Sequence, residues 1–174
     1  MILKPQDILF LLKLVSLNKA AWTFNELAIA LGMSASEVHA AAKRVIIARL
    51  ASKHESEIRP DIRNLQEFLL HGIQYVFVPE RGALNRGIPT AYAAEPLIHF
   101  FAENQDLPPV WPDPEGVVRG ESFSPLYKSV PKAIKQDAQL YMLLALVDAI
   151  RGGRAREREL AKKELIKRLN NYGQ

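Results

Sequence analysis

Apolar residues recur every three or four positions along most of the chain, which is the spacing that places them on one face of an α-helix. This pattern predicts helices over residues 4–17, 23–32 and 64–71, one that opens at Ser34, and two near the end, over 137–151 and 155–170. Two short segments, at 74–78 and 88–93, are instead rich in β-branched and aromatic residues and are predicted to pair as antiparallel strands. The expected fold class is therefore α+β, mainly helical with one small β-hairpin.

The stretch from Thr23 to Leu50 contains two helices joined by a tight turn. Thr23 can cap the first helix, and Gly32 can adopt the left-handed conformation that ends it. Ser34 and Glu37 have the spacing of a capping box, in which each side chain accepts a hydrogen bond from the other residue's backbone amide. Two helices in this arrangement are typical of a helix-turn-helix, which presents its second helix to the major groove of DNA.

The outer face of the second helix is small, polar and basic. Its alanines keep that face shallow, so the helix can approach a DNA groove closely, and its basic side chains can reach phosphates or guanine edges. The alternative is a helical hairpin that only packs, with a basic face that is merely solvated. The residues that we expect to contact DNA from this helix are Ser34, Ser36, His39, Lys43 and Arg44.

A connection with two glycines and two arginines separates the predicted strands. Gly82 and Gly87 give residues 79–87 conformational freedom, and Arg81 and Arg86 place two guanidinium groups on them. Such a loop can touch the DNA backbone or minor groove, as a wing does when it follows a helix-turn-helix. The alternative is a basic loop that is exposed only to solvent.

The stretch TFNELAIALGMSASEVHAAAKRVIIARL resembles the core of winged helix-turn-helix transcriptional regulators, broadly those of the MarR type. In that group a cap serine opens the recognition helix and an A-G-L-like ending leads to the wing; here residues 48–50 are ARL, with arginine where glycine is usual. The resemblance spans about residues 4–93 and implies DNA contact by the helix face given above, with Arg81 and Arg86 on the wing. The chain departs from the pattern because a predicted helix, 64–71, precedes the predicted hairpin.

The chain divides into three parts by composition. Residues 1–94 are predicted to form the DNA-binding domain, 95–130 a proline-rich connector, and 131–174 a C-terminal pair of helices. The apolar stripe from Leu140 to Ile150 must bury its face and is a candidate dimer interface. The basic run that follows is either a solvated helix or a second phosphate-facing surface, made of Arg151, Arg154, Arg158 and Lys162.

Composition narrows the functional classes. The chain has 174 residues and a net charge of +4, which permits a polyanionic partner without requiring one. It has no cysteine, its four histidines lack metal-ligand spacing, and no nucleotide-binding glycine motif or acid–base constellation is evident. We therefore expect no metal, no cofactor and no enzymatic activity. Because no signal peptide or membrane span is evident, we expect a cytoplasmic protein.

These expectations combine in a sequence-specific regulator that binds double-stranded DNA as a homodimer, with no membrane association. The competing hypothesis is a non-catalytic protein-interaction module, the antitoxin-like or adaptor partner of another protein, in which the winged helix serves only as a scaffold.

Overall fold

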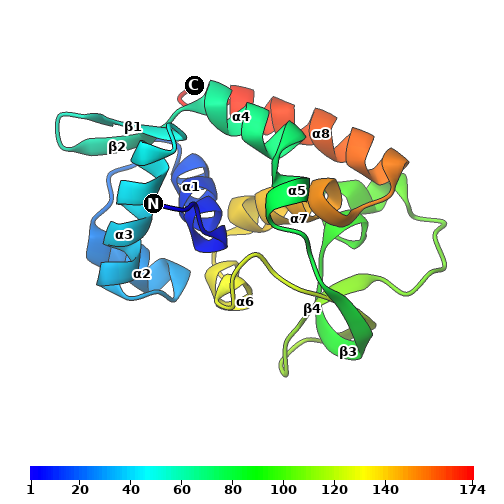
Figure 1. Ribbon diagram of the computed structural model, residues 1–174. Helices are drawn as coiled ribbons and strands as arrows, with labels where there is room; N and C mark the ends of the chain where they lie inside the picture. The colour runs from blue at the N-terminus through cyan, green and yellow to red at the C-terminus, as the bar shows by residue number, and fades with distance from the viewer.

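Five consecutive apolar residues, Ile8 to Leu12, cover every side of helix α1 (Pro5–Leu17), and this decides where the helix lies. Pro5 occupies the first turn, where a missing backbone N–H is tolerated, and residues Ile8 to Leu12 are fully buried. A helical segment that is apolar all round has to be covered on every side. In the computed structural model, which describes residues 1–174, α1 packs against both α3 (Ala35–Ile47) and α7 (Ala138–Gly152) (Figure 1).

The predicted two-helix unit is confirmed, together with its caps. Helix α2 (Phe24–Leu31) begins after Thr23, whose hydroxyl accepts a hydrogen bond from the Glu26 amide, and it ends at Gly32 with φ of 65°. Ser34 and Glu37 form the predicted capping box at the start of α3. The turn therefore has the geometry that its cap residues predict.

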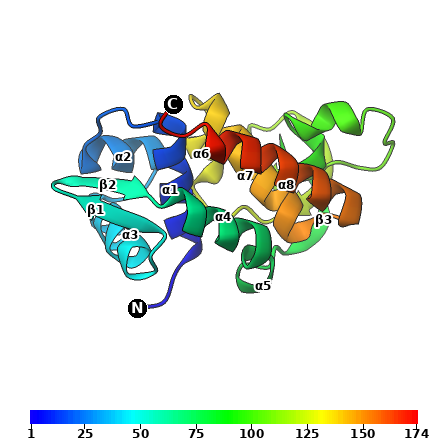
Figure 2. The same ribbon diagram turned by 90° about the horizontal axis from the view of Figure 1, so that it is seen from above.

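A β-hairpin follows α3 directly. Strands β1 (Ala51–His54) and β2 (Glu57–Pro60) pair antiparallel, with Ala51 opposite Pro60. Only one side of the hairpin is anchored, because Ala51, Ile58 and Pro60 are buried while most of its other residues are exposed. Figure 2 shows the hairpin extending along α2 and α3 and past them into solvent.

The chain between the hairpin and the second sheet is helical. The predicted helix over 64–71 is confirmed as α4 (Ile62–His71). The predicted strand at 74–78 is wrong, because residues Ile73–Val76 form a short helix, α5, that packs against α7. The predicted hairpin between 74–78 and 88–93 therefore does not exist.

The second sheet is built mostly from segments that the sequence assigned to a loop, 79–87, and to the proline-rich connector, 95–130; only the end of its first strand, Ile88 and Pro89, lies in the predicted strand 88–93. Strands β3 (Arg81–Pro89), β4 (Pro109–Pro112) and β5 (Val118–Phe123) each pair with the other two, so the small sheet closes on itself. Two 3-10 turns, Ala91–Ala93 and Leu97–Phe100, lie between β3 and β4. Because β4 and β5 belong to residues 95–130, this part of the chain is not a simple connector, and its Trp111 is buried in the core.

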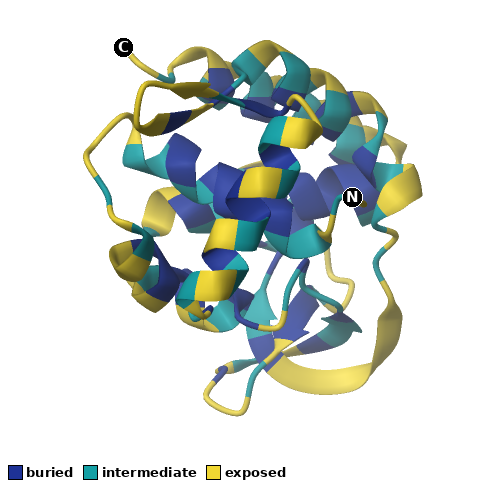
Figure 3. Cartoon of the chain, turned by 60° about the vertical axis from the view of Figure 1, so that its left-hand side comes forward, coloured by how far each residue is buried: buried dark blue, intermediate teal, exposed yellow.

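The chain ends with α6 (Val130–Ala133), α7 and α8 (Ala155–Asn170), and the last two match the predicted C-terminal helices. Helix α7 is buried along its length by α1, α5 and α8, so the stripe from Leu140 to Ile150 is internal and is not available as a dimer interface. One continuous core extends from Ile8 to Leu169. Figure 3 shows the buried residues where the helices face one another. The α+β class is confirmed.

One buried polar network fixes the second sheet to α7. Asp148 accepts hydrogen bonds from Thr90 Oγ1 at 2.7 Å, Trp111 Nε1 at 2.7 Å and Arg151 Nε at 2.9 Å. The Arg151 guanidinium also donates to two backbone carbonyls, one before the sheet and one after it, at 2.9 Å and 2.6 Å. Buried polar groups are tolerated when they are satisfied in this way. The network therefore holds the second sheet to α7.

Candidate nucleic-acid interface

Four of the five residues predicted on the recognition helix share one exposed surface. Ser34, Ser36, His39 and Lys43 are all exposed on the first three turns of α3. The His39 ring stacks on Phe24 of α2, with the ring centroids 3.8 Å apart and the planes 19° apart. This contact restrains the imidazole at the junction of the two helices. Along α3 the surface thus begins with two serines, continues with a histidine that is held by Phe24, and ends with a lysine.

Arg44, the fifth residue, points toward the core, which corrects its assignment to the surface that contacts DNA. Its Nε and Nη2 atoms donate to the two carboxylate oxygens of Asp7 at 2.8 Å and 2.7 Å. The Asp7 side chain is fully buried and that of Arg44 is 10% exposed. Hydrogen bonding to Asp7 raises the pKa of Arg44 further. Arg44 therefore locks α3 to the first turn of α1 and has no free donor fork for DNA.

Glu37, the only acidic residue of α3, is held in place by a contact with the C-terminal half of the chain. One oxygen of Glu37 accepts a hydrogen bond from the Ser34 amide at 2.7 Å, and the other accepts one from the Tyr127 hydroxyl at 2.6 Å. The hydrogen bonds from Tyr127 and Ser34 lower the pKa of Glu37 from 4.5 to about 2. The carboxylate is thus charged at neutral pH and fixed at the start of α3.

We expect the variant Tyr127→Phe to raise the pKa of Glu37 toward its ordinary value, because the strongest of its hydrogen bonds is lost. A carboxyl-detected NMR titration would measure this. In the intact protein the stabilisation from Glu37 is present above pH 4.5 and is lost as the pH falls toward 2. Tyr75→Phe, at an exposed tyrosine without a hydrogen bond, is the matched control. An unchanged pKa in Tyr127→Phe would contradict the assignment.

The β1–β2 hairpin supplies basic groups that the sequence did not assign to a wing. Lys53 and Arg59 are exposed on it, although the Arg59 guanidinium is partly committed to Glu57, at 2.7 Å and 3.1 Å. The imidazole of His54 shares a hydrogen bond with Ser52 at 2.9 Å. The alternation of Ala51, Ile58 and Pro60 with polar residues was the only signal for these strands.

Arg81 and Arg86 do not lie on a wing, which corrects the second site prediction. Both belong to β3, in the sheet at the far end of the molecule from α2 and α3 (Figure 1). Arg81 donates to the Gly152 carbonyl at 2.6 Å and lies 3.6 Å from Glu121. Arg86 faces Arg119 across the strand pair. These arginines and the α3 surface are therefore separate features.

The predicted second basic surface is not continuous. Arg151 is buried in the network around Asp148, and Arg158 donates to the Gly153 carbonyl at 3.1 Å and to Gln74 at 3.3 Å. Lys162 is half-buried, 4.0 Å from Glu159. Of the four residues, only Arg154 is exposed. Three of the four cations are thus engaged in contacts within the chain.

Two other kinds of feature are absent from the chain. No group of three or more His, Asp or Glu side chains is placed to hold one metal ion. None of the helices combines the length with the apolar content that crossing a bilayer requires. Comparisons with family models, with curated proteins and with solved structures found no match for this chain.

Proposed function

We propose that this protein binds double-stranded DNA as a winged helix-turn-helix regulator, with α3 in the major groove and the β1–β2 hairpin as the wing. The order α1, α2, α3, β1, β2 supports this proposal, because the hairpin follows the second helix of the pair directly. The wing is thus formed by residues 51–60 and not by residues 79–87. Lys53 and Arg59 take the role of backbone contacts that Arg81 and Arg86 had in the sequence prediction.

The observation that carries the proposal is the free outer face of α3. Lys43 is exposed and has no ion-pair partner, whereas the neighbouring Arg44 is fully committed to Asp7. Arg44 thus fixes the helix from behind, and Lys43, His39 and Ser36 remain exposed in front. Ser36 and His39 lie in the N-terminal half of α3, which is the part of a recognition helix that reaches base edges in this class of fold, and Lys43 lies nearer the C-terminal end of the helix.

The modest net charge of +4 affects how such a protein would achieve specificity. With few phosphate contacts per chain, a single copy would bind weakly, and two copies on a palindromic site would double the contacts. We propose a homodimer for this reason. Its interface has to lie outside the stripe from Leu140 to Ile150, because that stripe is buried within one chain.

We expect the variant Lys43→Ala to weaken duplex binding about fivefold and to reduce the salt slope by about one, since one phosphate or base contact is lost. Fluorescence anisotropy at several salt concentrations would measure both values. Lys163→Ala is the matched control, because Lys163 is an equally exposed lysine on α8. Equal losses in the two variants, or none in Lys43→Ala, would refute the choice of α3 as the DNA-binding face.

A second candidate function is that of a protein-interaction module. It is favoured by the large apolar side chains exposed on and beside α5, namely Tyr75, Val76 and Val78, which are 76%, 55% and 68% exposed. A salt titration on genomic and random duplexes separates the two functions. A steep slope and a preferred site support the regulator, whereas weak binding that does not respond to salt supports the module.

A further inference from the structure

Residues 127–135, which contain α6, lie against the turn between α2 and α3, although they belong to the C-terminal half of the chain. Figures 1 and 2 both show α6 beside α2. The Tyr127 hydroxyl donates to Glu37, on the first turn of α3, at 2.6 Å. The side chain of Lys132 passes so close to Gly32 that a Cβ added there would lie 3.1 Å from its Cδ. This stretch, the α6 segment, is therefore fixed beside the N-terminal end of α3.

The exposed surface of the α6 segment is entirely basic. Its three exposed residues are Lys128, Lys132 and Lys135. Its apolar side chains are instead buried in the core, namely Val130, Ala133 and Ile134. Lysine is depleted in the cores of protein–protein interfaces, whereas it is a common donor to the phosphates of nucleic acids. The composition of this surface therefore suits a phosphate backbone better than a protein partner.

Two of these three lysines are not committed within the chain. Only Lys135 forms an ion pair, with Glu115 at 3.0 Å. The pKa of Glu37 is lowered mainly by its hydrogen bonds, the strongest from Tyr127, and further by the charge of Lys128, so this ammonium lies near the start of α3. Lys128 thus offsets the charge of Glu37, and Lys132 leaves a net positive charge beside the α2–α3 turn. Such a charge attracts a polyanion to this end of the helix.

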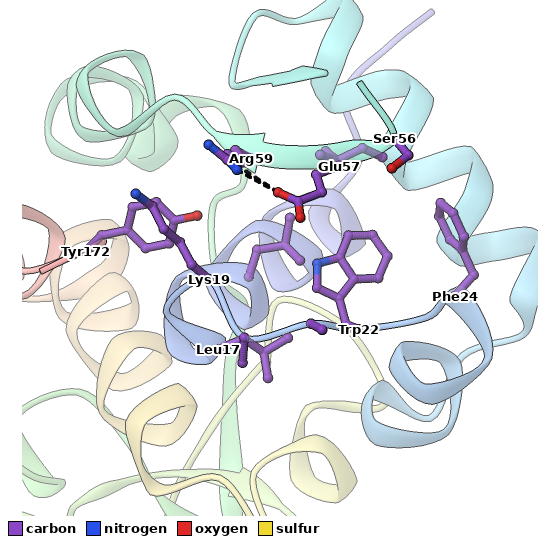
Figure 4. Close-up of a pocket in the computed structure, with 12 residues that line it drawn as sticks. Leu17, Lys19, Trp22, Phe24, Ser56, Glu57, Arg59 and Tyr172 are labelled. Atoms are coloured by element: carbon purple, nitrogen blue, oxygen red, sulfur yellow. Dashed lines mark hydrogen bonds and ion pairs between the residues drawn. The ribbon is translucent and has the colours of Figure 1, made fainter. Parts of the chain in front are cut away.

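The helix and the proposed wing have few free cations of their own. Arg44 is held in its buried ion pair, and Arg59 is paired with Glu57 at 2.7 Å, as Figure 4 shows. The remaining lysines of α3 and the hairpin are Lys43 and Lys53, one on each element. Affinity for duplex DNA depends strongly on the number of phosphates that a protein neutralises. Two further lysines beside α3 therefore represent a large addition.

The positions of the hairpin and the α6 segment are complementary. The hairpin begins at Ala51, shortly after the C-terminal end of α3, whereas the α6 segment contacts the N-terminal end through Tyr127. The major groove is about 12 Å wide and has a phosphate backbone on each side. A helix that enters the groove by its N-terminal end brings the element beside that end close to one of these backbones.

We propose that Lys128 and Lys132 bind the phosphate backbone of the duplex that α3 reads, at the opposite end of α3 from the wing. This inference rests on the proposed function, because it requires α3 in the major groove. It adds a third contact element to the helix and the hairpin, and this element comes from the C-terminal half of the chain. The C-terminal half is then part of the DNA-binding surface as well as a support for it.

The double variant Lys128→Ala/Lys132→Ala tests the inference by fluorescence anisotropy at several salt concentrations. We would use a duplex that the parent protein selects from a random pool, and a scrambled duplex of equal length. The double variant should bind both about tenfold more weakly, with the salt slope reduced by about two, because two phosphate contacts are lost. Lys135→Ala is the matched control, since this lysine of the same segment is paired with Glu115, and it should bind as the parent does.

Interference by phosphate ethylation locates the contacts. Phosphates whose ethylation blocks the parent protein but not the double variant should lie beside the bases read by α3. Lys53→Ala, on the wing, should release a different set of phosphates. The same set in both variants, or none in the double variant, would overturn the placement of the α6 segment at the opposite end of α3.

The anisotropy results also separate this inference from the proposed function. Unchanged affinity and salt slope in the double variant, together with a loss in Lys43→Ala, would overturn the inference and leave α3 as the DNA-binding face. A loss on the selected duplex alone would overturn the assignment to the backbone, because phosphate contacts carry no sequence information. A parent protein that binds neither duplex would refute the proposed function and this inference together.

Discussion

Replacing Asp148 by alanine should destabilise the protein by about 4 kcal/mol, the range measured when one partner of a buried ion pair is removed. Asp148 is 1% exposed and is the shared acceptor for Thr90, Trp111 and Arg151. Its loss leaves a buried guanidinium without a counter-charge and two further donors without an acceptor. Urea denaturation followed by far-ultraviolet circular dichroism would measure the change in the free energy of unfolding.

A milder variant keeps this prediction testable if Asp148→Ala fails to fold. Thr90→Val removes one of the three donors at similar volume and should cost about 1 kcal/mol, the usual net value of one hydrogen bond. Asp106→Ala, at an exposed aspartate, is the control and should have little effect. A loss below about 1 kcal/mol in Asp148→Ala would show that the network does not hold the sheet to α7.

Arg44→Met should cost about 3 kcal/mol, because it leaves the carboxylate of Asp7 buried without its cation at nearly unchanged side-chain volume. The Asp7 side chain is fully buried, and its only other hydrogen bond comes from the backbone amide of Lys4. The same denaturation experiment measures the loss. The value is somewhat smaller than for Asp148 because Arg44 retains 10% exposure and water can reach its end of the pair.

The neighbouring position provides the control for Arg44. Lys43→Met changes the adjacent exposed side chain on the same helix and should leave the free energy of unfolding within about 0.5 kcal/mol of the parent. Together with the DNA measurement on Lys43→Ala, this gives a double contrast: position 44 controls stability, and position 43 controls DNA binding. A similar stability loss at both positions would contradict the division of roles between the two residues.

Helices with local signals were predicted accurately from the sequence. The starts of α2 and α3 and the end of α2 follow from Thr23, Ser34 and Gly32, since caps act within one turn and do not depend on distant contacts. The long apolar repeats of α7 and α8 likewise gave their bounds to within one or two residues. The α3 surface of the candidate site follows from the same periodicity.

The strands could not be predicted, because their signals are weak or depend on distant partners. The β1–β2 hairpin has only Ala51, Ile58 and Pro60 on its buried side, so its alternation is short. Residues 81–86 of β3 are exposed throughout, and the strand is defined only by pairing with β5, more than 30 residues later. When the pairing with β5 is not known, the glycines and arginines of this segment resemble those of a loop.

The role of Arg44 could not be predicted for a related reason. Helical periodicity places it on the flank of α3, where it can turn toward solvent or toward the core. The choice is made by Asp7, which lies 37 positions earlier, and the pairing of two such residues is visible only in three dimensions. The pairings of Asp148 with Thr90 and Trp111 are equally non-local.

The position of α1 between α3 and α7 has a consequence for how this protein can change during evolution. Because α1 is covered on one side by α3 and on the other by α7, the α1 to β2 unit does not possess a finished surface of its own. If it were cut out and joined to another protein, it would carry an open apolar flank where α7 packs in the whole chain, and such a flank favours aggregation. The unit therefore cannot be transferred to another protein by itself, and we expect the α1 to β2 unit and the rest of the chain to change together during evolution.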